Sequence, residues 1–181
     1  MPKFVFILAC LAIALASYPL CRNKKDWAWL ACGLTFTVIA DYFLILRQVH
    51  LTGVAVFCMV HVCYILRVKR GYMVWLAILA QIAIIILFNV GSLYLLASFY
   101  AVLFIANIAI NLKWRKKNRA TVLAALLLFA LCDINVAIFN LHPTNGIAFT
   151  LIWVFYLPSQ LVLALSAVSW CKTKTIPTSS S

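Results

Sequence analysis

Apolar residues fill most of the chain in long runs, and short polar or basic segments separate one run from the next. About 20 residues of α-helix cover a hydrocarbon core of about 30 Å, so runs of this length can cross a membrane. The pattern predicts seven membrane-spanning helices, at residues 4–20, 27–46, 52–66, 72–90, 92–112, 121–141 and 147–170. The third run is short, and we expect flanking residues to complete its crossing.

Composition agrees with this pattern. The chain has 181 residues, of which 67% are hydrophobic and 10% are charged, whereas soluble domains are about half apolar and a quarter charged. Backbone groups in lipid must form hydrogen bonds within their own segment, which favours helices. We therefore predict one all-α, polytopic transmembrane helix bundle over residues 1–171, followed by a short disordered tail at 172–181.

Basic residues predict the orientation of the bundle. Thirteen of the 15 Lys and Arg residues fall on one side of the predicted membrane. They lie in the segments 22–25, 67–70, 113–119 and 172–174. The other side has Lys3 and Arg47. Since cytoplasmic loops carry the excess of basic residues, we expect an outside N-terminus and a cytoplasmic C-terminus.

The net charge of +12 could indicate a nucleic-acid partner, but these basic residues lie in short loops at one membrane face. We expect anionic lipid headgroups there, and no nucleic acid. The first run also matches a secretory signal peptide, with Lys3, an apolar stretch and "ALA" at 14–16. Cleavage would place the basic segment 22–25 on the exported side, so we expect the helix to be retained.

Acidic residues are scarce and oddly placed. The chain has three, Asp26, Asp41 and Asp133, and no glutamate. Asp41 lies in "VIADYFLIL" and Asp133 in "LFALCDINVAIFN", both inside predicted spans. Ionisable residues in membranes are costly and mark functional sites by default. The structural alternative is that each carboxyl is a hydrogen-bonding group that holds helices together.

Polar side chains from four predicted helices lie at similar depth. Counting 1.5 Å per residue, Asp41 is roughly 8 Å and Asp133 roughly 12 Å from the outer ends of their spans. Gly53, Phe57, His61 and Tyr64 share one helix face, and Tyr156 and Gln160 share another. The candidate site is therefore Asp41, Asp133, His61, Tyr64, Tyr156 and Gln160. Asn107 and Asn111 are better explained by bonding between helices.

Equal spacing suggests an internal repeat. Tyr64 follows Asp41, and Tyr156 follows Asp133, by the same number of residues, each time from an outward-running helix to the next inward-running one. The first three spans would then match the last three around a lone fourth.

Two stretches resemble a known family. "ADYFLILRQVHLTGVAVFCMVHVCYILR" and "LLLFALCDINVAIFN…VFYLPSQLVLALSA" are similar to the signatures of the YhhN-like integral membrane lysoplasmalogenases. The resemblance covers roughly residues 30–70 and 120–168. It implies a hydrolase that cleaves the vinyl ether bond of a lysoplasmalogen, a lysophospholipid, to a fatty aldehyde and a glycerophospho-base. A bacterial inner membrane or the endoplasmic reticulum is the expected location.

Two buried carboxyl groups suit this chemistry. A vinyl ether is protonated at carbon, water adds to the resulting oxocarbenium ion, and the hemiacetal collapses. As in glycoside hydrolysis, one carboxyl supplies a proton and the other stays ionised. We expect Asp41 and Asp133 to form this pair. Tyr64 and Tyr156 would orient carboxyls or substrate oxygens, Gln160 would contact substrate, and His61 would relay protons or contact phosphate.

Two other classes of protein remain open. A zinc-dependent intramembrane lipid hydrolase would need about three converging ligands, but of the histidines only His61 lies well inside a predicted span. The lysoplasmalogenase interpretation needs no metal and no cofactor. A transporter or proton-coupled carrier could also use buried aspartates in a repeated seven-helix fold.

Overall fold

The computed structural model describes residues 2–21, 23–68, 72–113 and 119–166, and this part of the chain contains seven α-helices. They are α1 (Pro2–Ala16), α2 (Lys24–Asp41), α3 (His50–Val68), α4 (Tyr72–Val90), α5 (Leu93–Lys113), α6 (Arg119–Leu141) and α7 (Gly146–Leu165). A short 3-10 turn, Tyr18–Leu20, follows α1, and a π-helix, Tyr42–Arg47, continues α2. The predicted all-α class is confirmed, whereas the predicted tail at 172–181 lies outside the described residues.

Within the described segments, five helices are long and apolar enough to cross a membrane. They are Lys24–Arg47, His50–Arg67, Leu93–Lys113, Ala120–Leu141 and Gly146–Leu165. The apolar segments of α1 and α4, Lys3–Ala16 and Trp75–Val90, are shorter. The third predicted run does gain residues at both ends, because α3 begins at His50 and ends at Val68.

Asparagine side chains begin two of these helices. The Asn23 side chain accepts a hydrogen bond from the backbone N–H of Asp26 at 3.3 Å, and Asn145 accepts one from Ala148 at 3.1 Å. Each bond satisfies a backbone donor that has no partner inside the first helical turn. Gly91 lies in the turn between α4 and α5 with φ of 73°, a conformation that glycine adopts without strain.

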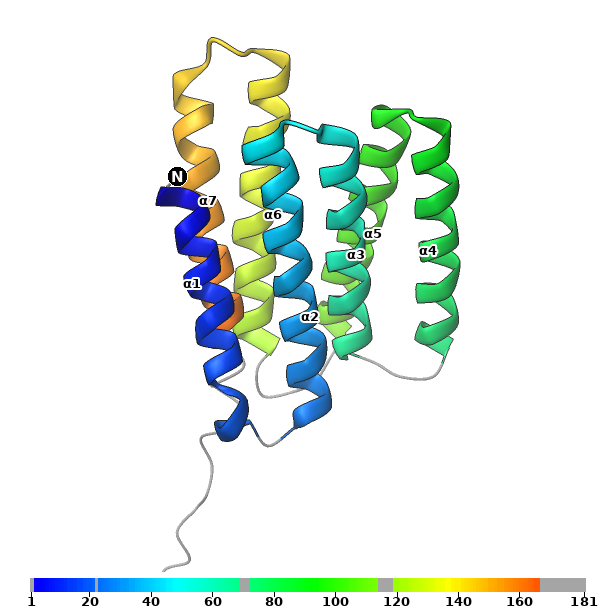
Figure 1. Cartoon of the computed structure of the whole chain (residues 1–181), viewed down its shortest axis with the longest axis vertical. Helices are drawn as coiled ribbons and strands as arrows, with labels where there is room; N and C mark the ends of the chain where they lie inside the picture. Colours follow the sequence, from blue (N-terminus) through cyan, green and yellow to red (C-terminus); the bar gives the residue numbers. More distant parts are fainter. Residues whose placement is uncertain (1, 22, 69–71, 114–118, 167–181) are drawn as a thin grey trace, which may run out of the picture.

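The helices form two layers, with α4 at one edge (Figure 1). Helices α1, α2 and α3 lie in front in this view, and α7, α6 and α5 lie behind them. The contacts are most extensive between α6 and α7 and between α2 and α3, and the layers meet through α1 with α7 and α3 with α5. An edge helix beside two groups of three is the arrangement that the proposed repeat requires, and the repeat itself stays a prediction.

Exposed apolar side chains follow the same arrangement. Large hydrophobic residues on the outer faces of α4 and α5 are mostly exposed, for example Trp75, Ile85 and Ile105. A soluble protein rarely exposes so much contiguous apolar surface, but lipid-facing helices do. Polar groups lie instead in the interior, where α2, α3, α5 and α7 contribute them.

Candidate active site

Asp41 lies where α2 changes its helical geometry. The α-helix ends at this residue, and a π-helix takes over from Tyr42 until Gln48, whose left-handed φ of 55° closes the segment. π-Helical turns are rare and often accompany functional residues. The wider turn is held in place by Leu44, which packs so closely on Gly53 of α3 that a Cβ atom there would overlap it.

The Asp41 carboxyl has a tyrosine as its partner. The Tyr156 hydroxyl on α7 donates a hydrogen bond to Asp41 Oδ2 at 2.6 Å, and both side chains are 3% exposed. This bond joins residues from opposite ends of the chain. Tyr156 therefore contacts one of the predicted carboxyls, as a group that orients a carboxyl must.

Asp133 has the same kind of partner on different helices. The Tyr100 hydroxyl on α5 donates to Asp133 Oδ2 at 2.6 Å. Asp133 is half-buried, so this carboxyl is less enclosed than that of Asp41. The two aspartates thus form two separate carboxyl–tyrosine pairs.

An aromatic cluster lies between the two pairs. The Phe129 ring is 5.6 Å from the ring of Tyr156 and 6.1 Å from that of His61, measured between centroids. The His61 ring is in turn 5.0 Å from the ring of Tyr100. These contacts bring the two carboxyl–tyrosine pairs into one region of the bundle.

His61 is fully buried at the centre of this cluster. Its Nδ1 atom is 3.3 Å from the amide nitrogen of Asn107, and Asn111 donates to the amide oxygen of Asn107 at 2.9 Å. Because the amide nitrogen is a donor, Nδ1 accepts and a neutral imidazole carries its proton on Nε2. That nitrogen has no hydrogen-bond partner among the described residues.

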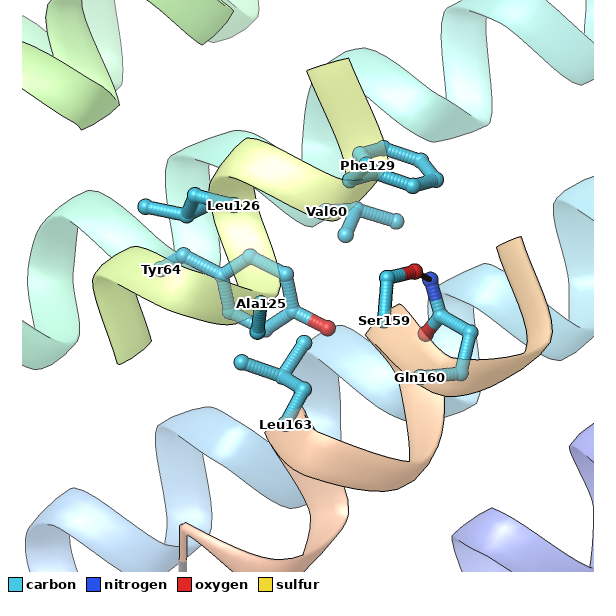
Figure 2. A pocket seen from close by; sticks show the side chains of 8 residues that line it. All are labelled: Val60, Tyr64, Ala125, Leu126, Phe129, Ser159, Gln160 and Leu163. Carbon is cyan, nitrogen blue, oxygen red and sulfur yellow. Dashed lines mark hydrogen bonds between the residues drawn. The ribbon is translucent and has the colours of Figure 1, made fainter. Parts of the chain in front are cut away.

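Tyr64 and Gln160 line a small cavity rather than bonding to the carboxyls of Asp41 and Asp133 (Figure 2). The Tyr64 ring packs against Gly33 of α2, where a Cβ atom would overlap it. The hydroxyl that reaches Asp133 belongs to Tyr100, which the sequence argument missed. A depth count could have found it, since Tyr100 is about seven residues from the start of α5, roughly 10 Å, close to the depth estimated for Asp133.

Asn107 and Asn111 form different kinds of hydrogen bond. Asn107 does bond between helices, as predicted, through its contact with His61. The hydrogen bonds of Asn111 stay within α5, where its amide donates to the backbone and side chain of Asn107. Its effect on the site is therefore indirect, because it fixes which way the Asn107 amide faces.

The third acid, Asp26, has a cationic partner. Arg67 Nε lies 3.2 Å from each carboxylate oxygen of Asp26, and Arg67 Nη1 donates to the Ser166 hydroxyl at 2.9 Å. Asp26 and Arg67 are 6% and 5% exposed. The prediction that Arg67 lies in a loop facing lipid headgroups was therefore wrong: the residue is buried and joins α2, α3 and the end of α7 inside the protein.

The described residues bring together no group of three His, Cys, Asp or Glu side chains that could hold a metal ion. Cys32 and Cys63 approach each other, with sulfur atoms 3.7 Å apart, but they form a pair alone. The zinc-hydrolase alternative therefore lacks a ligand set in this part of the chain.

Fold and site together define a helical membrane protein with two tyrosine-bonded carboxyls in its interior. Comparison with known families refines this class: the model of the YhhN family matches residues 2–167, and the chain belongs to this family. The comparisons with curated proteins and with solved structures gave no match.

Proposed function

We propose that this protein is an intramembrane hydrolase that cleaves the vinyl ether bond of lysoplasmalogens. The observation that carries the proposal is the pair of interior carboxyls, Asp41 and Asp133, each bonded by a tyrosine hydroxyl at 2.6 Å. Membership of the YhhN family supports the same chemistry. A vinyl ether needs a proton donor and a group that stabilises a cation, rather than a serine or cysteine nucleophile.

The reaction begins with transfer of a proton from one carboxyl to the vinyl carbon. The adjacent ether oxygen then shares the positive charge of an oxocarbenium ion, which the other, ionised carboxyl stabilises. Water adds to the cationic carbon, and the hemiacetal breaks down to the glycerol hydroxyl and a fatty aldehyde. Two carboxyls divide the same work in glycoside hydrolysis.

The neighbouring residues support these steps. Tyr156 and Tyr100 fix one oxygen of each carboxyl, so the second oxygen is the one that faces substrate. The Nε2–H of His61 is a donor without a partner among the described residues, and it is suited to an ether or phosphate oxygen. The aromatic and aliphatic surroundings exclude bulk water, which strengthens charge stabilisation.

We further propose that all seven helices cross the membrane with the N-terminus outside. The distribution of basic residues supports this orientation, and it places the candidate site in the outer half. The lysolipid would insert its alkenyl chain between helices and keep its polar headgroup toward the outer surface. Anionic headgroups would bind the basic cytoplasmic face.

The test is product identity. Purified protein in detergent is incubated with lysoplasmalogens and with ester lysolipids, and free aldehyde and free fatty acid are measured. Aldehyde from the vinyl ether substrates alone supports the proposal, and fatty acid would mean ester hydrolysis and would contradict it. Detergent removes any gradient, so turnover there also separates hydrolysis from transport. Activity that disappears on chelation would favour the zinc alternative.

A further inference from the structure

An ammonium group lies against two aromatic rings where the start of α1 meets α7 (Figure 1). The Lys3 ammonium of α1 is 3.9 Å from the centroid of the Trp153 ring and 4.7 Å from that of the Phe149 ring, both on α7. Ring faces attract cations within about 6 Å, and proteins use this attraction to recognise ammonium ligands. The Trp153–Phe149 pair is therefore suited to an ammonium cation, and a lysine of the same chain fills it.

This lysine is held by the rings without a carboxylate. In the part of the chain that the structure describes, Lys3 forms no ion pair with an acidic residue. The Phe149 side chain is 46% exposed and Lys3 is itself half-buried, so the rings can be reached from the surface of the bundle. A contact between a cation and an exposed ring is weak, so another ammonium group can replace that of Lys3.

The aromatic pair is next to one of the candidate carboxyls. Phe149, Trp153 and Tyr156 lie on one face of α7, because they follow each other at intervals of four and three residues. The ring centroids of Trp153 and Tyr156 are 6.1 Å apart, and the Tyr156 hydroxyl donates to Asp41. Along the helix axis, the two rings lie about 5–10 Å from Tyr156, toward the end at which α7 begins.

This separation fits the covalent structure of a lysoplasmalogen. The glycerol carbons and the phosphodiester lie between the vinyl ether and the nitrogen of the base, and a chain of this length can span two helical turns. A lipid with its vinyl ether at Asp41 would therefore place its base at Trp153 and Phe149. Its phosphate would lie between these two points, within reach of the flexible Lys3 side chain.

We propose that Trp153 and Phe149 bind the ammonium group of the lipid headgroup, and that Lys3 leaves the rings when the lipid binds and pairs with its phosphate. The identity of the lipid rests on the proposed function, and the site adds the headgroup class, a zwitterion with a phosphodiester and an ammonium. The exchange keeps the charges balanced, because one ammonium replaces another and Lys3 neutralises the phosphate. A headgroup without a cation gains no contact with the ring faces.

Lysine NMR tests the exchange directly. Reductive ¹³C-methylation keeps the charge of each lysine, and the ring currents of Trp153 and Phe149 shift the Lys3 methyl signal upfield. Lys3→Met identifies this signal by its loss. The probe is a saturated alkyl ether lysophospholipid with a choline headgroup, added to the protein in detergent micelles; it has no vinyl ether and cannot be hydrolysed.

On addition of the probe, we expect the Lys3 signal to move to the position of an exposed lysine such as Lys25. The Lys24 ammonium, which lies 3.7 Å from the centroid of the Tyr18 ring, is the matched control, and its signal should stay unchanged. A Lys3 signal that keeps its upfield position at saturating probe would overturn the proposal.

Affinity provides a second arm. The choline probe is compared with an isosteric lipid in which carbon replaces the headgroup nitrogen, at high ionic strength to screen non-specific attraction to the basic chain. The wild-type protein should bind the choline probe about threefold or more tightly, as one cation–ring contact allows. Phe149→Leu should remove most of this preference. Phe88→Leu, which changes an exposed phenylalanine of α4, is the control and should retain it. Equal binding of the two lipids by the wild-type protein would overturn the proposal.

The two arms separate this proposal from the proposed function, because neither probe can react. Displacement of Lys3 without aldehyde release from any vinyl ether lipid would retain the headgroup site and reject the hydrolysis. Aldehyde release by a protein whose Lys3 signal does not move would retain the hydrolase and reject the headgroup site.

Discussion

The three acidic residues of this chain are held in two different ways. Asp26, near the end of the bundle that carries most of the basic residues, forms a buried ion pair with Arg67. Asp41 and Asp133, in the interior, have tyrosine hydroxyls as partners. A guanidinium neutralises a carboxylate, whereas a phenol stabilises one oxygen and leaves the charge of the group open to change.

This difference separates structural from chemical roles. An ion pair that links three helices gives each charged group its opposite within the protein, which suits a structural role. A carboxyl without a cationic partner can be protonated or ionised as its surroundings change, which acid–base catalysis requires. We therefore expect loss of Asp26 to affect folding and loss of Asp41 or Asp133 to affect turnover.

The largest expected effect is on turnover. Asp41→Asn and Asp133→Asn keep the shape of each side chain but remove its proton-transfer ability, so aldehyde release should fall by about 10²–10⁴-fold. The measurement is the initial rate of aldehyde release by purified variants.

Asp26→Asn is the matched control for these variants. It should leave kcat nearly unchanged in the molecules that fold, while reducing their yield. Full activity in a folded Asp41→Asn or Asp133→Asn protein would remove that residue from the catalytic mechanism.

The largest expected effect on stability comes from breaking the ion pair. Arg67→Met leaves the Asp26 carboxylate buried without its partner, and such changes cost about 3–5 kcal/mol. Unfolding in mixed detergent micelles measures the free energy. The double variant Asp26→Leu with Arg67→Met should recover part of the loss, and no recovery would mean that the residues act independently.

The sequence predicted the helices but missed some of the contacts between them. Long apolar runs placed all seven helices, because hydrophobicity acts locally. The Asp26–Arg67 pair was missed because its members are far apart in the chain and each resembles a residue of a polar rim. Tyr100 was missed for a similar reason: a tyrosine on a mostly lipid-exposed helix gives no local sign that it faces a carboxyl.

Depth estimates grouped Asp41, Tyr156 and His61 in one region, but depth alone could not predict which side chains bond. In the structure the hydrogen bond joins Asp41 to Tyr156. Spacing along the chain gives depth in the membrane, and rotation of each helix about its axis decides which side chains meet. The π-helix after Asp41 changes that rotation, and no glycine or proline in Tyr42–Arg47 marks it.

An intermediate effect on the free energy of unfolding should distinguish Tyr156 from Tyr100. Tyr156→Phe removes a donor from a carboxyl that is almost fully buried, so about 1–3 kcal/mol of stability should be lost. Tyr100→Phe should cost less, because Asp133 is half-buried and its carboxyl is therefore less completely desolvated. Unfolding free energies of both variants provide the comparison, and equal losses would mean that enclosure does not distinguish the two pairs.

The smallest expected effect on stability concerns Lys3, a cation that contacts aromatic rings rather than a carboxylate. The Lys3 ammonium lies 3.9 Å from the centroid of the Trp153 ring and 4.7 Å from that of Phe149, which links α1 to α7. Such contacts contribute about 0.5–2 kcal/mol. Lys3→Met should therefore lower the free energy of unfolding by less than Arg67→Met does, and the exposed Lys25→Met serves as the control. A loss as large as that of Arg67→Met would contradict this order. It would mean that the pairing of opposite charges does not make the Asp26–Arg67 contact stronger than the contact of Lys3 with the aromatic rings.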